Sequence, residues 1–203
     1  MIKALIFDFG NVFLNLDIEK GVKESLKLFK IESFGEDMLT YNHLYEKGLI
    51  STETFLEFYS NRFPKLSKQT LIELWNSILK DFPEHRLKFI QKLASEKQFK
   101  LILLSNTNEL HINWVKSKID FYESFKNCFD AFYLSHEIGH RKPDNSIFKF
   151  VLNENHFMAQ ECLFIDDTQE HILNASKLGI HTWNINPKTD DITELFKVNQ
   201  HLF

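Results

Sequence analysis

Short apolar runs alternate with amphipathic stretches along most of this chain. Each run has about the length of a strand that is buried on both faces of a sheet. The runs are Lys3–Phe7, Lys100–Leu104, Ala131–Leu134, Cys162–Ile165 and His181–Trp183. The stretches with apolar residues at helical spacing include His85–Gln98, Asn145–Asn153 and Thr168–Leu178. Because strands that alternate with single helices form parallel sheets covered on both faces, the pattern predicts a doubly wound α/β core.

The segment between the first two predicted strands has a different pattern. Residues 15–82 contain no convincing strand and break into several amphipathic segments, among them Ser51–Phe63 and Ser67–Leu79. Turn-forming residues at Gly35 and Pro64 separate these segments. We therefore expect a core domain formed by residues 1–14 and 83–203, and a small all-helical domain, residues 15–82, inserted after the first strand.

Composition and charge narrow the class of protein. With 203 residues, of which 43% are hydrophobic, the chain is long enough for one substantial core and a small inserted lobe. Its net charge of −4 provides no positive surface for nucleic acid or an anionic membrane. Cys128 and Cys162 lack the spacing of a disulfide framework or zinc site, and Asp8 interrupts the first apolar run too early for a signal peptide. We expect a cytoplasmic protein with no nucleic-acid or membrane partner, and the sequence carries no indication of its oligomeric state.

Polar residues follow four of the predicted strands at their carboxyl ends, where open α/β sheets build their sites. Asp8 follows the first strand, and the turn Ser105–Asn108 follows the second with a hydroxyl, an amide and free backbone N–H groups. The basic loop Gly139–Asp144 carries Lys142 after the third strand, and the adjacent acids Asp166-Asp167 end the fourth. Together they supply a nucleophile, hydrogen-bond donors, a cation and oxygen ligands for a hard metal, which are the groups that phosphoryl transfer needs.

With these polar residues in this order at the four strand ends, the sequence resembles the haloacid dehalogenase superfamily over essentially the whole chain. Its finer motifs are similar to the bacterial branch of α-D-glucose-1-phosphate phosphatases. These motifs are Phe7-Asp8-Phe9-Gly10-Asn11-Val12, Leu104–Asn108 with Leu110-His111, Tyr133-Leu134-Ser135 with Gly139 and Arg141-Lys142-Pro143, and Asp166-Asp167. The resemblance implies a Rossmann-like core with a helical cap domain. It also implies magnesium-dependent phosphatase activity on a small phosphorylated metabolite, with a sugar phosphate such as glucose 1-phosphate expected.

The resemblance implies roles for individual residues as well. Asp8 would attack phosphorus and carry a transient aspartyl-phosphate, with Ser105 and Lys142 completing the catalytic set. The substrate would be bound by Gly10, Asn11, Ser105, Asn106 and Lys142. Mg²⁺ would be held by Asp8, the Gly10 carbonyl and Asp167. Asp166 would complete the metal site, either by orienting a metal-bound water or by pairing with Lys142.

Gly10 is the main departure from the superfamily pattern, which has a second aspartate two residues after the nucleophile. That aspartate protonates the leaving oxygen and then activates water. Without it, the leaving group departs with little help, as an anomeric hydroxyl does, or the enzyme is slow, or another acid such as Asp17, His43 or Glu46 takes over. His171 is a smaller departure from the Asn or Asp of relatives, and it either contacts a metal-bound water or simply sits on its helix.

Other interpretations of the same residues stay open. Taken singly, Asp8 is as readily a turn residue, Ser105 part of a helix cap, and Lys142 a solvated charge. A haloacid dehalogenase would use the same nucleophile without magnesium, and a phosphosugar mutase would benefit from slow hydrolysis of the phospho-enzyme. A binding or regulatory protein would keep the fold after losing turnover. The pair Asp166-Asp167 favours the phosphatase, because adjacent acids after a buried strand need a counter-ion.

Overall fold

The computed structural model describes all residues from Met1 to Phe203 and contains one five-stranded parallel sheet. The strands are β1 (Ala4–Phe7), β2 (Lys100–Ser105), β3 (Ala131–Leu134), β4 (Cys162–Asp166) and β5 (His181–Asn184). Their order in the sheet is β3-β2-β1-β4-β5. Each predicted apolar run forms one of these strands, and the predicted doubly wound α/β core is confirmed. Because β1 is the central strand, the residue that follows it lies between the ends of β2 and β4.

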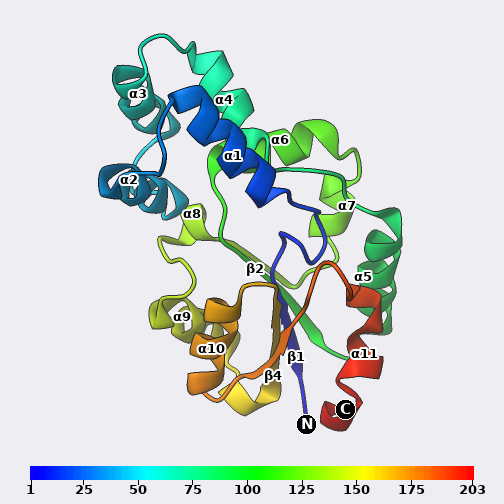
Figure 1. Cartoon of the computed structure of the whole chain (residues 1–203). Coiled ribbons are helices and arrows are strands. Elements are labelled where there is room, and N and C mark those ends of the chain that lie inside the picture. The colour runs from blue at the N-terminus through cyan, green and yellow to red at the C-terminus, as the bar shows by residue number, and fades with distance from the viewer.

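Helices cover both faces of the sheet. The longer core helices are α5 (Glu84–Glu96), α6 (Glu109–Lys118), α9 (Asn145–Asn155) and α10 (Gln169–Lys177), and the short ones are α7 (Tyr122–Lys126), α8 (Ser135–Ile138) and α11 (Leu195–Val198). Along β1, Leu5 and Phe7 pack with residues of α5, α6, α7 and α11, whereas Ala4 and Ile6 pack with α9 and α10. Figure 1 accordingly shows α9 and α10 on one side of the sheet and α5 and α11 on the other. The alternation of side chains along a strand divides the core into these two layers.

Four further helices lie between β1 and β2 in the sequence: α1 (Ile18–Phe29), α2 (Glu36–Glu46), α3 (Thr52–Arg62) and α4 (Lys68–Asn76). We call them the insertion helices. Apolar periodicity indicates α1, α3 and α4 but not α2, because its apolar residues do not lie on one face: Met38 and Tyr45 are buried while Leu39 is exposed. Serines at positions 51 and 67 cap α3 and α4 by accepting hydrogen bonds from Thr54 N and Thr70 N. Helices α3 and α4 therefore begin directly after their capping serines.

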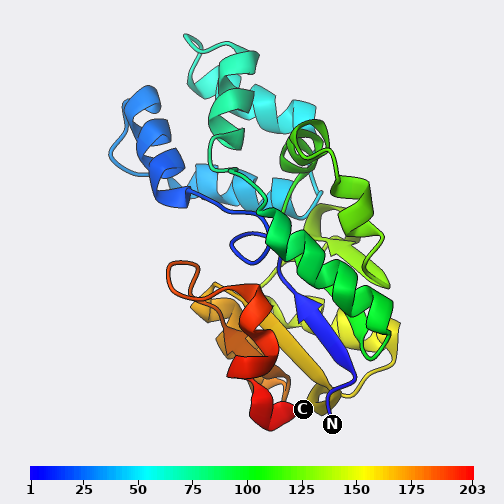
Figure 2. The ribbon, with the colours of Figure 1, turned by 90° about the vertical axis from the view of Figure 1, so that its right-hand side faces the viewer.

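The insertion helices lie beyond the carboxyl end of the sheet, and both chain termini lie at the opposite end (Figures 1 and 2). Two chain segments connect them to the core and pair with each other in antiparallel fashion. Asn15 N donates to the carbonyl of Asp81, Lys80 N donates to the carbonyl of Asn15, and Asp17 N donates to that of Ile78, at 2.8–3.0 Å. This paired connector holds the insertion helices above the strand ends.

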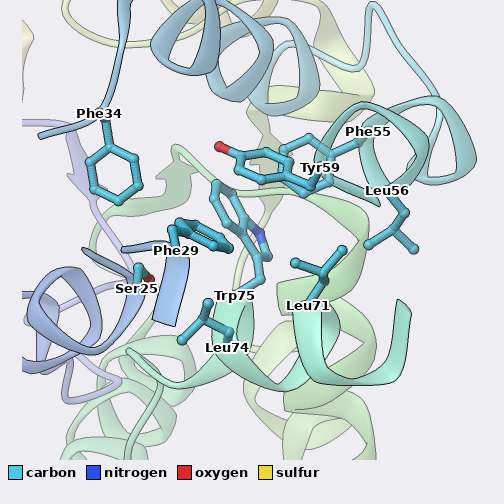
Figure 3. Close-up of a pocket in the computed structure, with 9 residues that line it drawn as sticks. All are labelled: Ser25, Phe29, Phe34, Phe55, Leu56, Tyr59, Leu71, Leu74 and Trp75. Carbon is cyan, nitrogen blue, oxygen red and sulfur yellow. The ribbon is translucent and has the colours of Figure 1, made fainter. Parts of the chain in front are cut away.

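The insertion helices enclose a small apolar core of their own. Figure 3 shows Phe29 of α1, Phe55 and Tyr59 of α3, and Trp75 of α4 turned toward one another around a cavity of about 40 Å³. Leu110 of α6 also belongs to this cluster and joins it to the core domain. The cavity is lined almost entirely by apolar side chains and has room for little more than one water molecule, so it offers no site for a charged substrate. Across the whole chain, no helix has the length and apolar character that crossing a membrane requires.

Candidate active site

Three carboxylates meet at the carboxyl edge of the sheet. Asp8 directly follows β1, Asp166 ends β4, and Asp167 comes next in the chain. One oxygen of each lies within 4.8 Å of an oxygen of the others, and we call these three residues the acidic cluster. They come together because β1 and β4 are neighbours in register, with Phe7 opposite Ile165. Three negative charges at this separation require a cation or proton nearby.

Lys142 supplies one such cation. Its side chain is completely buried, and its Nζ lies 2.8 Å from Asp8 Oδ1 and 2.7 Å from Asp166 Oδ2. The third proton of the ammonium group goes to the carbonyl of Leu104 at 2.8 Å. The backbone of the lysine is held by Asn106, whose side-chain amide accepts from Lys142 N and donates to Lys142 O, both at 2.8 Å. All three ammonium donors are used, so the position of Nζ is determined from several sides.

The carboxylate of Asp166 is saturated with protein donors. Oδ2 contacts Lys142 Nζ, Oδ1 accepts from Thr168 N at 2.8 Å, and Nδ1 of His171 lies 3.0 Å from both oxygens. Since the acceptor is a carboxylate, His171 donates from Nδ1. Asp166 therefore holds Lys142 and His171 in place. From the sequence, His171 was expected either to contact a metal-bound water or to have no role beyond its place on the helix. The structure shows a third arrangement, a hydrogen bond to Asp166.

Asp167 is oriented by the turn after β1. Asn11 Nδ2 donates to Asp167 Oδ2 at 2.8 Å, and Asn11 Oδ1 accepts from Leu16 N at 3.0 Å. Asn11 has a left-handed backbone with a φ of 56°, a conformation that asparagine tolerates better than most residues. Its side chain is thus occupied by Asp167 and the backbone of Leu16.

The pKa values of these groups reflect burial and mutual repulsion. Burial, reinforced by Asp166 and Asp167 and opposed by Lys142, raises the pKa of Asp8 to about 7. Burial also raises the pKa of Asp167 above its ordinary value. Burial opposes the ionised forms of Lys142 and Asp166 too, but their mutual attraction outweighs it, so the pKa of Lys142 is raised and that of Asp166 is lowered. Asp8 and Asp167 are consequently the two carboxylates whose ionised forms are disfavoured in the metal-free site.

Backbone donors face the same edge of the sheet. The N–H groups of Phe9, Gly10 and Asn106 donate no hydrogen bond within the chain. Thr107 N, in contrast, donates to Ser135 Oγ at 2.9 Å. The Ser105 hydroxyl is buried and makes only a long contact of 3.5 Å with the Asn106 carbonyl. Lys142 takes the Oδ1 atom and one Nδ2 proton of the Asn106 side chain, whereas the backbone N–H of Asn106 has no partner in the chain. Unpaired N–H groups at strand ends are suited to an anion.

A cleft of about 200 Å³ opens over the acidic cluster. Its polar wall contains Asp8, Ser105, Asn106, Asn108, His111 and Asp167. The opposite wall is apolar and comes from the connector and α1, with Leu16, Ile18 and Ile78. A Cβ atom built on Gly10 would lie 2.6 Å from Leu16 Cδ1. The leucine therefore fills the space that a side chain at position 10 would need.

Of the three residues named as substitutes for an acid at position 10, only one lines the cleft. Asp17 caps α1 by accepting from Lys20 N and lies 3.6 Å from Lys80 Nζ, outside the cleft. His43 is exposed on α2 and does not line the cleft either. Glu46, the last residue of α2, does line it.

His111 is a cleft residue to which the sequence alone assigned no role. Its Nε2 donates to the Trp75 carbonyl at 3.1 Å, and its Nδ1 therefore accepts from Asn108 Nδ2 at 3.2 Å. Burial lowers the pKa of His111 to about 4, so the ring is neutral at ordinary pH. Its sequence signals were its place one turn after the helix-capping Asn108 and its membership of the motif Leu110-His111, whereas the bond to Trp75 of α4 is a tertiary contact.

The donor atoms at the site fit a hard divalent cation. Asp8 and Asp167 offer carboxylate oxygens, Gly10 offers a carbonyl, and no histidine nitrogen or thiol belongs to the cluster. Magnesium prefers such all-oxygen donors and commonly takes one or two carboxylates. A cation there would also stabilise the ionised forms of Asp8 and Asp167, whose pKa values are raised by burial and, to a smaller extent, by the neighbouring carboxylates.

Comparison with known proteins gives a consistent result over nearly the full chain. The sequence pattern of the haloacid dehalogenase-like hydrolases matches residues 5–185. The D-ribitol-5-phosphate phosphatase of Bacteroides thetaiotaomicron is 28% identical over 90% of this chain and 91% of that protein. A haloacid dehalogenase family enzyme from the same organism, solved with magnesium, is 33% identical with a TM-score of 0.84, covering 97% of this chain and 98% of the other. The same enzyme solved with magnesium and inorganic phosphate has a TM-score of 0.82 at 31% identity, over 97% of this chain and 100% of the other.

Other solved structures show the same fold at greater distance. A predicted haloacid dehalogenase-like hydrolase from Porphyromonas gingivalis is 26% identical with a TM-score of 0.82, over 98% of both chains. A dehalogenase structure reaches a TM-score of 0.60 at 17% identity, over 97% of this chain and 96% of the other. At that level of identity the dehalogenase shares the fold alone.

Proposed function

The chain belongs to the haloacid dehalogenase-like hydrolase family, and we propose that it is a magnesium-dependent phosphatase acting on a small phosphorylated metabolite. One observation carries this proposal: the acidic cluster encloses a buried ammonium group, with Lys142 Nζ 2.8 Å from Asp8 and 2.7 Å from Asp166. This arrangement joins a nucleophile, a cation and oxygen ligands for a metal within a few ångströms.

In the proposed reaction, an Asp8 oxygen attacks phosphorus while the bond from phosphorus to the leaving oxygen breaks, and the leaving oxygen takes up a proton and departs as an alcohol. Water then attacks the aspartyl-phosphate, releasing inorganic phosphate and restoring the carboxylate. Lys142 compensates charge on Asp8 and on the transferring group, and the free N–H groups of Phe9, Gly10 and Asn106 bind phosphate oxygens.

Asp8, Asp167 and the Gly10 carbonyl would hold Mg²⁺, which when bound neutralises charge on the transferring phosphoryl group. We assign Asp166 to holding Lys142 and His171 rather than to direct ligation, because both of its oxygens already accept hydrogen bonds from the protein. Ser105 has a hydroxyl without a strong partner, and we propose that it donates to a phosphate oxygen.

We further propose that residues 15–82 form a cap domain over the core of residues 1–14 and 83–203. The insertion helices have their own apolar cluster, and only the paired connector joins them covalently to the core. A cap in this position would exclude bulk water from Asp8 and contact the leaving group.

The proposed substrate is a phosphorylated sugar or sugar alcohol. The curated relative acts on D-ribitol 5-phosphate, and the finer motifs of this chain resemble glucose-1-phosphate phosphatases. The two compounds differ in the leaving group, since one releases a primary alcohol and the other an anomeric hydroxyl. Both compounds therefore serve as probes of the proposed function.

We also propose that the protein is cytoplasmic, as the sequence predicts.

Release of inorganic phosphate from a panel of phosphorylated sugars and sugar alcohols tests the function. The expected result is turnover with Mg²⁺, loss of turnover with EDTA, and no turnover by Asp8→Asn under either condition. Equal activity in Asp8→Asn would overturn the nucleophile, and a wild-type protein that binds Mg²⁺ but hydrolyses no phosphate ester would favour a binding or regulatory role.

A further inference from the structure

Glu46 is the one charged side chain that the insertion helices contribute to the cleft over Asp8. Resting on the proposed phosphatase function, we propose that Glu46 is a specificity-determining residue that accepts hydrogen bonds from hydroxyl groups of the leaving group. The substrate class is then a phosphate ester of a polyol, as opposed to an alkyl, aryl or aminoalkyl ester.

The first argument is the way the carboxylate is held. Glu46 Oε2 accepts from Arg141 Nε at 2.9 Å, and both side chains are largely buried. Oε1 has no partner in the chain. Arg141 directly precedes Lys142, and Lys142 contacts Asp8. The position of Glu46 relative to the nucleophile is therefore set through Arg141 and Lys142. One oxygen is anchored and the other is free for a ligand.

The second argument is its place on α2. Glu46 is the last residue of the helix, where the helix dipole disfavours a negative charge by about 0.3–1 kcal/mol. The dipole and the half-buried position both work against a carboxylate, and Arg141 offsets them. Helix formation therefore gives no reason for an acid at this position; pairing with Arg141 and ligand binding are the two roles that would, and the control variant below separates them.

The third argument is electrostatic. A carboxylate repels a phosphate dianion, so Glu46 suits the part of the substrate that is not phosphate. An ionised carboxylate only accepts hydrogen bonds, so the leaving group must donate them. Because Arg141 already neutralises its charge, neutral hydroxyl donors fit better than an ammonium group. Hydroxyl-rich leaving groups meet all of these conditions.

The remainder of the cleft matches the same class of ligand. Leu16, Ile18 and Ile78 provide an apolar wall, against which the C–H surface of a sugar or sugar alcohol can pack. The cleft has a volume of about 200 Å³, which corresponds to the liquid volume of roughly seven water molecules. This is suited to a single monosaccharide-sized group.

The test compares matched pairs of substrates in wild type and Glu46→Gln. One pair is D-ribitol 5-phosphate and n-pentyl phosphate, and the other is α-glucose 1-phosphate and cyclohexyl phosphate. The ratio of kcat/KM within a pair measures the preference for hydroxyl groups, and the intrinsic reactivity of each ester cancels when variants are compared. We expect Glu46→Gln to lower the ratio of the better pair by roughly 10–100-fold, mainly through KM, as for a lost hydrogen bond to a charged group.

Lys47→Met is the matched control. Lys47 Nζ pairs with Asp144 Oδ2 at 2.8 Å, so this variant removes a neighbouring contact between α2 and the same core loop without touching the cleft. It should leave the ratio unchanged. An equal fall in Lys47→Met would mean that Glu46 acts only by docking α2, and would overturn the inference.

Two further outcomes separate this inference from the proposed function. If wild type hydrolyses p-nitrophenyl phosphate with Mg²⁺ but has the same ratios as Glu46→Gln, or turns over ethanolamine phosphate better than both polyol phosphates, Glu46 does not select polyols although the protein is a phosphatase. If wild type hydrolyses no ester at all, including p-nitrophenyl phosphate, the proposed function and this inference fail together.

Discussion

Nζ of Lys142 lies 2.8 Å from Oδ1 of Asp8, and the lysine side chain is completely shielded from solvent. A buried ammonium group is costly unless it is paired and fully hydrogen-bonded. Here Asp8, Asp166 and the Leu104 carbonyl take all three of its protons. The lysine thus serves the fold and the proposed chemistry at once, because the same group balances the charges of the acidic cluster and faces the nucleophile.

Lys142→Met is expected to abolish measurable phosphatase activity and to destabilise the protein by about 3–5 kcal/mol, since it leaves two buried carboxylates without their cation. The loss of stability should be smaller in acid, where these carboxylates take up protons. Chemical denaturation at two pH values measures the difference. A loss that is the same at both values would contradict the charge-pairing explanation.

Asp8→Asn is expected to stabilise the metal-free protein at about pH 8 by on the order of 1 kcal/mol. The pKa of Asp8 is raised to about 7, so the folded state binds a proton more tightly than the unfolded chain does. Stability contributed by that proton is present at low pH and is lost as pH rises from about 4 toward the raised pKa. Thermal unfolding in EDTA should therefore show wild type and variant diverging as pH increases. Convergence at high pH would contradict the raised pKa.

Gly10→Asp tests whether Leu16 excludes an acid from this position. The new Cβ would meet Leu16 Cδ1, so the single variant should fold less stably than Gly10→Asp/Leu16→Ala. Relative to Leu16→Ala, the double variant should hydrolyse n-pentyl phosphate about 10–100-fold faster. This factor lies at or below the lower end of the rate enhancements typical of general acid catalysis. The Leu16→Ala single variant is the control for the space alone. No gain over that control would mean that leaving-group protonation does not limit the rate.

Asp167→Asn should raise the Mg²⁺ concentration for half-maximal activity by roughly 10-fold or more, because it removes a charged oxygen ligand. Stability should change little, since the Asn11 amide still meets an oxygen at this position. Activity titrated with Mg²⁺ and unfolding in EDTA provide the two measurements. An unchanged Mg²⁺ dependence would remove Asp167 from the proposed metal site.

Asp191→Asn should destabilise the protein at neutral pH by about 1 kcal/mol. Burial alone would raise the pKa of Asp191, but hydrogen bonds from His85, Thr193 and Arg86 outweigh it and hold the pKa well below its ordinary value. A lowered pKa contributes stability above the ordinary value of about 4, and this is lost as pH falls below it. The unfolding curves of wild type and variant should approach each other in acid, and a constant gap would contradict the assignment.

The sequence predicted the strands well because buried strands carry a local signal. Ala4–Phe7 is apolar throughout and is followed by Asp8, and Cys162–Asp166 is apolar up to its last residue; such short runs between helical stretches have few alternatives. Helix α2 carried a weaker signal: its buried residues Met38 and Tyr45 share a face, but Leu39 lies off that face and is exposed, so its apolar residues form no single stripe. Its position depends on packing against other insertion helices, which periodicity does not report.

By itself, the sequence determined that Asp8, Ser105 and Asp166 stand at the carboxyl ends of parallel strands, because apolar runs and strand polarity are properties of local segments. Only the tertiary structure decided that β1 lies between β2 and β4, which brings these residues together. It also decided that Lys142 is buried, that Leu16 occupies the space beside Gly10, and that Glu46 reaches the cleft while Asp17 and His43 do not. The burial of Lys142 and the position of Glu46 depend on contacts between residues far apart in the chain, and the contact of Leu16 with Gly10 depends on how the turn after β1 folds back; hydrophobic periodicity encodes neither.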